Sequence, residues 1–280
     1  MITAQHLVYR YDPKDTPVLD RVSLEIPEGQ YVAVIGPNGC GKTTLVKHFN
    51  ALLVPQEGEV LVDGLSTRDA KAHREIRRRV GMVFQNPDNQ IVGMSVEEDV
   101  AFGPGNLGLA PAEIRGRVGV ALETVGMLRL AKRAPHSLSG GEKRLVAIAG
   151  VLAMRPAYVV LDEPTSGLDP AGRARVLNVL WDLRQEGISV IHVTHSMEEI
   201  VDADRVVVMS EGKILRDGAP RDVFREADAL RAVGLSTPQV TELMGRLRAL
   251  GCEVRPDVLS VEEAFREISA LVGTGTGGGR

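Results

Sequence analysis

The chain has 280 residues, 44% of them hydrophobic and 25% charged, which is the composition of an ordinary folded protein and excludes a disordered, collagen-like or low-complexity chain. Its 33 basic and 37 acidic side chains give a formal net charge of -4, so no bulk positive field favours nucleic acid as a partner. The two cysteines lie far apart without metal-ligand spacing, which excludes a disulfide framework and a zinc ribbon and favours a reducing compartment.

The sequence contains no recognisable export or membrane signal. No run approaches the ~18 apolar residues of a transmembrane helix, and the first residues lack the basic and apolar segments of a secretory signal. We therefore expect a chain that neither crosses a membrane nor is exported. At roughly 150 residues per domain, its length fits one large domain with an appendage, or two small domains.

The N-terminal half predicts a β-rich entry followed by alternating helices and strands. Turn residues separate the first three β-type runs, and amphipathic helices follow from Gly36 on. The elements expected here are strands at Ile2–Tyr9, Val18–Ile26, Tyr31–Ile35, Glu59–Val62 and Val80–Phe84, and helices from Thr43, near Ala70–Arg79 and from Val96 to about Gly126.

The second half repeats the alternation and then becomes helical. We expect a helix after Ser139, strands at Tyr158–Leu161, Ser189–Val193 and Arg205–Met209, and helices at Ala171–Gln185, Ala227–Leu250 and Val261–Leu271. Apolar strands bounded by helices predict a buried parallel sheet. The predicted organisation is a main domain over 1–225 with a helical subdomain at about 86–155, a small C-terminal appendage over 226–272, and a disordered Gly-rich tail over 273–280.

A phosphate-binding loop is predicted at residues 36–43, which match G-x-x-x-x-G-K-[ST] directly after an apolar strand and before a helix. The backbone N–H groups would close around phosphates, Lys42 would reach the β and γ oxygens, and Thr43 would offer a hydroxyl to Mg²⁺. The alternative is a glycine-rich turn, which leaves Lys42 and Thr43 unexplained. The residues assigned to the nucleotide are Gly36, Pro37, Asn38, Gly39, Cys40, Gly41, Lys42, Thr43 and Thr44.

Two adjacent carboxylates, Asp162 and Glu163, end an apolar strand. Asp162 is the candidate Mg²⁺ ligand, and Glu163 is positioned to orient or deprotonate an attacking water. The alternative is a pair of solvated turn residues, which a phosphate loop elsewhere in the chain makes less favoured.

The segment Leu138–Glu142 opens a long helix, and Ser139 with Glu142 satisfies a capping box. Capping is a serious alternative to a functional role, since the same pattern recurs at Ser95/Glu98 and Ser196/Glu199, where a helix start is explanation enough. Gly140 and Gly141 favour function, because they bare the backbone N–H groups at a helix N-terminus and so predict a second anion-binding end.

The ordered set of phosphate loop, Gln85, Leu138–Glu142, Asp162-Glu163, Ser166–Asp169 and His195 resembles the ATP-binding cassette ATPases over residues 1 to about 225. The resemblance implies an α/β P-loop core with an antiparallel β subdomain and a helical subdomain. It implies head-to-tail pairing with a second cassette, so that Ser139, Gly140, Gly141 and Glu142 of one chain close over ATP held by the other.

Further roles follow from the resemblance. Tyr11 would stack on adenine, Gln85 would sense the γ-phosphate and Mg²⁺, Asp169 would be the acid of the interface loop, and His195 would contact the γ-phosphate. Together with Lys42 and Glu163, Gln85 and His195 make up the expected catalytic set, and Thr43, Gln85 and Asp162 make up the expected metal set.

Several of these residues have competing interpretations. Tyr11 could be a plain surface aromatic, and Tyr9 is its rival for the stacking role. His192 offers His195 a partner for a metal site, but residues three apart in an extended segment face opposite sides. Cys40 adjoins a helix N-terminus as a reactive thiol would, yet a small side chain in the loop is the favoured interpretation, although its oxidation could block nucleotide binding.

A narrower resemblance lies in Phe84–Gln90, Val96–Pro104 and Leu138–Arg144, which are similar to the ATP-binding subunits of energy-coupling factor importers for cobalt, nickel and vitamins. It implies a place on the cytoplasmic face of the cell membrane, with a transmembrane energy-coupling subunit and a substrate-binding membrane subunit as partners. Coupling helices would lie along Asp88–Gly103. The appendage, with Leu235–Val240 and Ser260–Ala264, would support dimer contacts.

Rival functions are a soluble cassette ATPase of DNA repair or translation, and a regulatory ATP-binding module. Long coiled-coil insertions or a second cassette would favour the soluble ATPase, and the sequence contains neither. Glu163 argues against the regulatory module. The basic run at Lys71–Arg79 has no interleaved aromatics and contains Glu75, so a solvated helix face is favoured over a nucleic-acid patch. We expect an Mg²⁺-dependent ATPase driving import, with the transported substrate and the identity of the partner cassette left open.

Overall fold

The computed structural model describes residues 1–275 and contains two β-sheets. The smaller sheet is antiparallel, with strands in the order β2-β1-β4-β5. Its members are β1 (Ile2–Tyr9), β2 (Leu19–Ile26), β4 (Glu57–Val62) and β5 (Leu65–Ser66). Buried and exposed residues alternate along β2, as they do in a sheet with one face on the core.

The larger sheet has the order β10-β9-β3-β8-β7-β6, and its strands are parallel except for the antiparallel β9–β10 pair. Its strands are β3 (Tyr31–Ile35), β6 (Val80–Val83), β7 (Tyr158–Asp162), β8 (Ser189–Val193), β9 (Arg205–Ser210) and β10 (Lys213–Gly218). Asp162 at the end of β7 pairs with Val193 at the end of β8. The segments that follow β7 and β8 therefore leave the sheet at the same edge.

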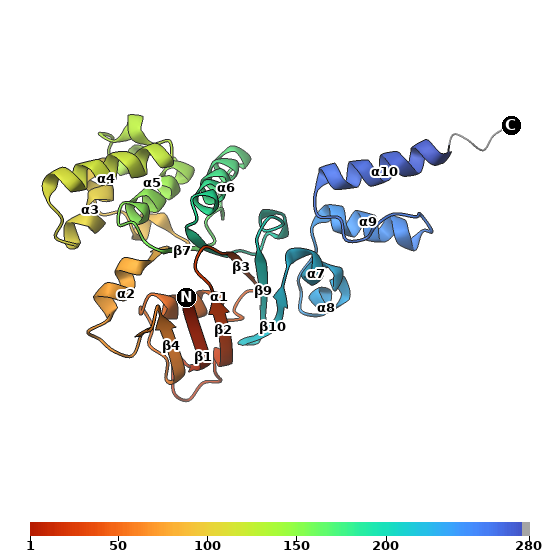
Figure 1. Cartoon of the computed structure of the whole chain (residues 1–280), viewed down its shortest axis with the longest axis horizontal. Coiled ribbons are helices and arrows are strands. Elements are labelled where there is room, and N and C mark those ends of the chain that lie inside the picture. The colour runs from red at the N-terminus through yellow and green to blue at the C-terminus, as the bar shows by residue number, and fades with distance from the viewer. Residues whose placement is uncertain (276–280) are drawn as a thin grey trace.

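The helices are α1 (Lys42–Phe49), α2 (His73–Arg79), α3 (Val96–Asn106), α4 (Pro111–Thr124), α5 (Gly140–Leu152), α6 (Pro170–Gln185), α7 (Pro220–Arg225), α8 (Ala227–Ala232), α9 (Gln239–Ala249) and α10 (Val261–Gly275). Short 3-10 helices lie at Pro87–Asn89, Leu128–Leu130, Pro135–Ser137 and Met197–Glu199. Helices α3, α4 and α5 gather at one end of the molecule, and α9 and α10 project at the other (Figure 1). No helix of the described residues is long and apolar enough to span a bilayer.

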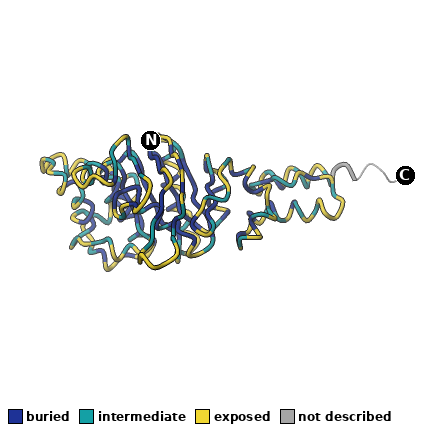
Figure 2. Tube along the Cα trace, turned by 90° about the horizontal axis from the view of Figure 1, so that it is seen from below, coloured by how far each residue is buried: buried dark blue, intermediate teal, exposed yellow. Residues whose placement is uncertain are grey.

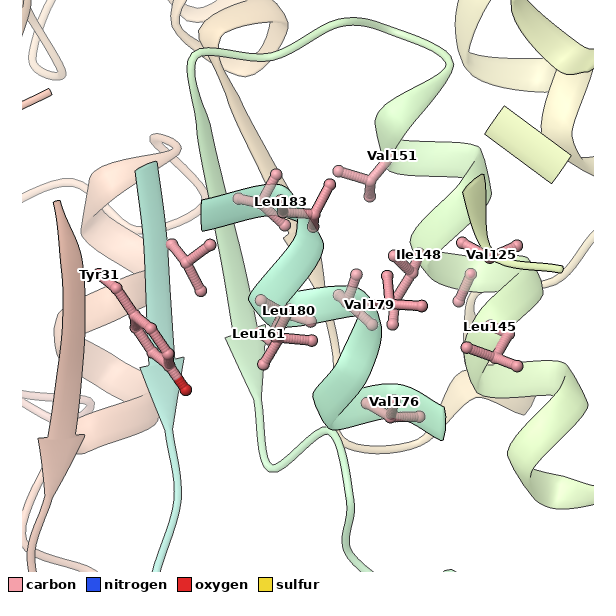
Figure 3. Packing of buried hydrophobic residues seen from close by; sticks show 14 of the residues in the cluster. Tyr31, Val125, Leu145, Ile148, Val151, Leu161, Val176, Val179, Leu180 and Leu183 are labelled. Carbon is pink, nitrogen blue, oxygen red and sulfur yellow. The ribbon is translucent and has the colours of Figure 1, made fainter. Parts of the chain in front are cut away.

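The core lies on both faces of the larger sheet, and β3 shows why. Val32 and Val34 belong to the cluster shared with α1 and the antiparallel sheet, whereas Ala33 and Ile35 belong to the cluster shared with α5 and α6. In the second cluster, Figure 3 shows α6 side chains packed between Leu161 of β7 and Ile148 of α5. The sheet is therefore covered on both sides, as a parallel sheet requires.

The appendage has a small core of its own around Met244, Val254, Val258 and Ala264. Figure 2 shows buried residues concentrated in the two-sheet body, whereas α9 and α10 are mostly intermediate or exposed. Arg221 of α7 joins the two parts, because its guanidinium donates to the Asp257 carbonyl at 2.7 Å and to Glu263 at 2.8 Å.

The expected elements agree with the structure apart from local differences. The helices expected from Val96 to about Gly126 are α3 and α4, joined by residues 107–110. The stretch Ala227–Leu250 is broken between α8 and α9, where Gly234 takes φ +79° and Pro238 precedes the new helix. Strand β10 was not foreseen. Helix α10 runs to Gly275, into the segment 273–280 for which we expected disorder, and the rest of that segment lies outside the described residues.

Candidate active site

The loop between β3 and α1 has the backbone of a phosphate-binding turn. Gly39 and Gly41 take φ of +79° and +104°, and a Cβ on Gly41 would lie 2.7 Å from the Val18 carbonyl oxygen. A Cβ on Gly36 would lie 2.4 Å from the Met209 carbonyl oxygen, so this position also admits only glycine. Lys42 is buried, and its Nζ donates to the Gly36 carbonyl at 2.7 Å and to the Pro37 carbonyl at 3.0 Å. The ammonium group is thus held over the loop.

Thr43 and Asp162 meet across the sheet edge, where the Thr43 hydroxyl donates to Asp162 Oδ2 at 2.8 Å. The other carboxylate oxygen, Oδ1, is buried and has no hydrogen-bond partner, and burial raises the pKa of Asp162. Gln85 lines the same cavity. A hydroxyl, an unpartnered carboxylate oxygen and an amide form the hard-oxygen ligand set that small divalent cations take, so these residues fit such an ion.

Glu163 and His195 form a pair beside this metal set. The His195 Nδ1–H donates to Glu163 Oε2 at 2.7 Å, and the imidazole side chain is 60% exposed. Glu163 has φ +51°, and its own N–H donates to the Val193 carbonyl at 2.9 Å, which ties the residue to the end of β8. The pair presents a carboxylate able to accept a proton next to an imidazole open to a ligand.

A cavity of about 340 Å³ brings most of the predicted first half-site together. Its walls are Tyr11, Val18, Asn38, Gly39, Gly41, Lys42, Thr43, Thr44, Gln85, Asp162 and Glu163. Val18 was not among the predicted residues, and it lines the cavity because its carbonyl packs on Gly41. Cys40 does not line the cavity, and burial raises the pKa of its thiol, which disfavours the reactive thiolate.

The structure distinguishes Tyr11 from Tyr9. Tyr11 is 60% exposed at the cavity wall, and its hydroxyl lies 3.0 Å from the Thr44 Oγ1. Tyr9 packs edge-on against both Tyr11 and His48, with ring centroids 5.2 and 4.9 Å apart. Tyr11 is therefore the tyrosine of this pair that is exposed at the cavity wall, and its role in adenine binding stays a prediction.

The second half-site lies on a different part of the chain. The capping box at the start of α5 is complete, because the Glu142 N–H donates to the Ser139 hydroxyl at 3.3 Å and the Ser139 N–H donates to the Glu142 carboxylate at 2.8 Å. That backbone donor lowers the pKa of Glu142. Asp169 caps α6 through the Gly172 N–H at 2.8 Å. Of the predicted residues, Ser139, Gly140, Gly141, Glu142 and Asp169 do not line the cavity around Lys42.

His192 takes no part in a site with His195. It lies buried in β8, where its Nδ1 is 2.9 Å from the Tyr31 hydroxyl and its Nε2 is 3.5 Å from Glu199 Oε2, whereas His195 is exposed after the end of β8, bonds Glu163 and does not itself line the cavity. The two imidazoles therefore have different partners and share no ligand site.

A family model described as ABC transporter matches residues 19–166. The chain belongs to the ABC transporter family. The cobalt import ATP-binding protein CbiO of Syntrophus aciditrophicus is 57% identical over 96% of each chain, and the energy-coupling factor transporter ATP-binding protein EcfA1 of Caldanaerobacter subterraneus is 52% identical over 94% of this chain and 96% of its own. Within the ABC transporter family, the chain is thus an ATP-binding protein of the energy-coupling factor group and an ATPase.

Solved structures of the family have the same fold. CbiO1 from Clostridium perfringens, described as part of the CbiONQ complex, has a TM-score of 0.76 at 38% identity and covers 89% of this chain and 98% of its own. A dimeric ABC cassette in a post-hydrolysis state with ADP and phosphate has a TM-score of 0.71 at 30% identity and covers 79% of this chain and 99% of its own. These matches confirm the predicted P-loop α/β cassette.

One sequence interpretation was wrong, and it concealed a residue of this site. Ser196 and Glu199 form no capping box: the helix that follows Ser196 is the 3-10 turn Met197–Glu199, without a side-chain cap. The Glu199 carboxylate instead turns inward to Thr165 and Thr194. Arg144, also unforeseen, is buried in α5 and donates to the Phe84 carbonyl beside Gln85. No motif spacing links either residue to its partners.

Proposed function

We propose that this chain is the ATP-hydrolysing motor of an importer at the cytoplasmic face of the cell membrane, which couples binding and hydrolysis of Mg-ATP to uptake of a micronutrient, either a vitamin or a transition metal ion. The observation that carries the proposal is the meeting of the Thr43–Asp162 and Glu163–His195 pairs beside the Lys42 loop. The similarity to CbiO and EcfA1 supports the transport role.

The hydrolytic chemistry follows from the geometry of these residues. Glu163 accepts a proton from a water whose oxygen attacks the γ-phosphorus, and the bond from that phosphorus to the bridging oxygen breaks as ADP leaves with the electron pair. Lys42 and the amides of residues 36–43 stabilise the charge on the phosphates, and His195 holds the γ-phosphate. Thr43, Asp162 and Gln85 would hold Mg²⁺, which neutralises phosphate charge.

Each active site is completed by a second cassette chain, identical or paralogous. The separation of Ser139, Gly141 and Asp169 from the Lys42 cavity supports this arrangement, because one chain then owns two incomplete halves. The dimeric relative with ADP and phosphate supports it further. In the dimer, the N-terminus of α5 from the partner would face the γ-phosphate with exposed amides and a favourable helix dipole.

The membrane subunit would dock in a cavity of about 840 Å³ between α2, α3 and α5. Of the stretch Asp88–Gly103, five residues line it: Gln90, Val92, Asp99, Phe102 and Gly103. Val92 and Phe102 are exposed, so the cavity offers apolar contacts to an entering helix, and Arg74 and Arg77 of α2 also line it. Gln90 joins this groove to the active site, since its side chain bonds both the Phe84 N–H and the Met82 carbonyl next to Gln85.

The appendage would add contacts between the two cassettes. Phe265 of α10 is 71% exposed, and Val261 and Leu250 are exposed nearby in the same small unit. Burial of this apolar surface against a second copy would stabilise the pair.

The test is a mild-detergent pull-down of the tagged full-length chain carrying Glu163→Gln in the presence of Mg-ATP. We expect recovery of a polytopic membrane protein together with a small substrate-binding membrane subunit, and the latter would name the class of cargo. The matched control is the same variant without nucleotide. Recovery of soluble proteins, DNA or ribosomes alone would refute the transport role and leave the ATPase.

A further inference from the structure

Glu199 is a buried carboxylate that the hydrolytic chemistry above does not use. It ends the 3-10 turn that follows β8, and its side chain is 1% exposed. A carboxylate at such depth is tolerated only when its oxygens are well hydrogen-bonded. The residues that contact Glu199 therefore indicate which structural role the buried carboxylate has.

Both oxygens of Glu199 accept hydrogen bonds, and the donors come from separate segments. Oε1 accepts from the Thr165 hydroxyl at 2.6 Å and pairs with the Arg173 Nε at 2.7 Å. Oε2 accepts from the Thr194 hydroxyl at 3.0 Å and lies 3.5 Å from the His192 Nε2. Burial alone would raise the pKa of Glu199, but these neighbours outweigh it and lower the pKa to about 2, so the carboxylate is ionised.

The two threonines stand next to the proposed reacting residues. Thr165 follows Glu163 by two positions, and Thr194 directly precedes His195. Glu163 and His195 bond each other at 2.7 Å, so the Glu199 carboxylate closes a second bridge behind that pair. Glu163 also needs support, because its φ of +51° is a conformation that L-residues seldom adopt without surrounding restraint.

The same carboxylate reaches the loop that leads to the dimer interface. Thr165 begins the turn whose Leu168 N–H bonds the Thr165 carbonyl, and Asp169 follows as the cap of α6. Arg173 of α6 bonds Ser196, directly after His195, as well as Glu199. Two short loops that leave the ends of β7 and β8 are thus held by one buried charge.

We propose that Glu199 is a positioning residue for hydrolysis, which through Thr165 and Thr194 fixes Glu163 and His195 in the geometry that the attacking water and the γ-phosphate require. The proposal rests on the roles given to Glu163 and His195 in the proposed function. Glu199 itself touches neither water nor phosphate. It acts on the hydrolytic step and leaves the phosphate loop and the Tyr11 face, which bind nucleotide, unchanged.

The test compares hydrolysis and nucleotide affinity in full-length variants. Glu199→Gln removes the charge but keeps the shape, Thr165→Val removes one hydrogen bond, and Thr165→Ser restores it. Glu186→Gln is the matched control, because Glu186 is exposed and its side chain makes no hydrogen bond or ion pair within the described part of the chain. Phosphate release gives kcat, and a fluorescent ATP analogue gives affinity.

We expect Glu199→Gln and Thr165→Val to lower kcat by about tenfold or more while affinity for the analogue changes by less than about twofold, because the loss falls on the transition state. Thr165→Ser and Glu186→Gln should keep the wild-type kcat.

Full kcat in Thr165→Val, or equal losses of kcat and affinity, would each overturn the proposal. Where Glu199→Gln fails to fold, the Thr165→Val and Thr165→Ser pair decides alone. If Glu163→Gln itself hydrolyses ATP at the wild-type rate, the role that the proposed function gives to Glu163 fails and the positioning role with it. If Glu163→Gln is inactive and both Thr165 variants are fully active, only the positioning role fails.

Discussion

His48 is buried directly behind the phosphate loop, on the α1 helix that Lys42 begins. Its ring packs against Tyr9, its Nδ1 bonds the Thr44 carbonyl at 2.8 Å, and its Nε2 is buried without a partner. Burial lowers the pKa of His48 to about 4, although the bond to Thr44 opposes the shift. A protonated ring at this place would put a charge in the core beneath the nucleotide site.

The stability of the protein should therefore depend on pH through His48. The folded state keeps this ring neutral down to about pH 4, whereas the unfolded chain protonates it below about pH 6.5. The unfolded state binds more protons between these values, so the stabilisation is complete above pH 6.5 and is lost as the pH falls toward 4. Between pH 7 and pH 5, we expect the wild type to lose about 2 kcal/mol more unfolding free energy than His48→Gln does.

Urea unfolding of both proteins at the two pH values measures this difference. The Gln side chain keeps an N–H donor for the Thr44 carbonyl but does not titrate. The His48→Gln protein therefore reports how all other titratable groups change the unfolding free energy between the two pH values. Equal losses in the two proteins would show that His48 is not held neutral by the fold.

At this scale, the sequence could predict residues whose role depends on local backbone spacing. Lys42 and Thr43 follow the glycines that shape their loop, and Asp162 and Glu163 end an apolar strand, so each lies where a motif places it. Glu199 could not be predicted, because its partners come from β8, from α6 and from the turn after β7. Its pattern with Ser196 matched a capping box, and only three-dimensional packing decides between the two.

The α5 helix shows how one local pattern can serve two purposes. Ser139 and Glu142 complete a capping box, and the same residues begin the segment that would close over the partner's ATP. Ser95 also caps α3, by accepting from the Glu98 N–H, but it belongs to no segment that we assign to the partner's ATP. A comparison of the two helices therefore distinguishes a capping role from a role in catalysis.

We expect Ser139→Ala and Ser95→Ala each to lower the unfolding free energy by about 1 kcal/mol, the usual cost of an N-cap. Only Ser139→Ala should also reduce ATP hydrolysis, by about tenfold or more, because it alone removes a hydroxyl that we propose to contact the partner's ATP. Thermal unfolding and phosphate release under folding conditions measure the two effects. Similar hydrolysis rates in the two variants would leave Ser139 with a capping role alone.

The elements that were predicted well have uniform surroundings. Strands β3, β7 and β8 are buried at every residue and read as short apolar runs, whereas β10 at the sheet edge is half exposed and carries Lys213, Arg216 and Asp217. An edge strand of this kind lacks the apolar signal that marks a buried one. Loop conformations, such as the break between α8 and α9, depend on packing that the sequence does not express.

For the whole molecule, the separation of the two half-sites predicts that activity depends on pairing. In dilute solution, ATP hydrolysis should rise faster than linearly with protein concentration, and Glu163→Gln should form a dimer with Mg-ATP because the closed state is no longer discharged by hydrolysis. Phosphate release over a dilution series and sedimentation of the variant measure these effects.

Phe265→Ser is the companion variant for that experiment, since it removes an exposed apolar side chain of the appendage without touching either half-site. With Phe265→Ser, the rise of specific ATPase activity should occur at a higher protein concentration, and the maximal specific activity should stay unchanged. Activity that stays linear to the lowest concentration, without a dimer already present, would contradict the two-chain site.

The two incomplete halves that we propose for each chain have a genetic consequence. If identical chains pair, a chain with a defective Lys42 loop still offers an intact α5 end, and a chain with a defective α5 end still offers an intact loop. Two defective alleles of these different kinds would therefore rebuild one working site when expressed together, whereas two alleles of the same kind would not. A dimer of one defective chain and one wild-type chain would have one inactive site. Loss of function at this locus would therefore be partly dominant.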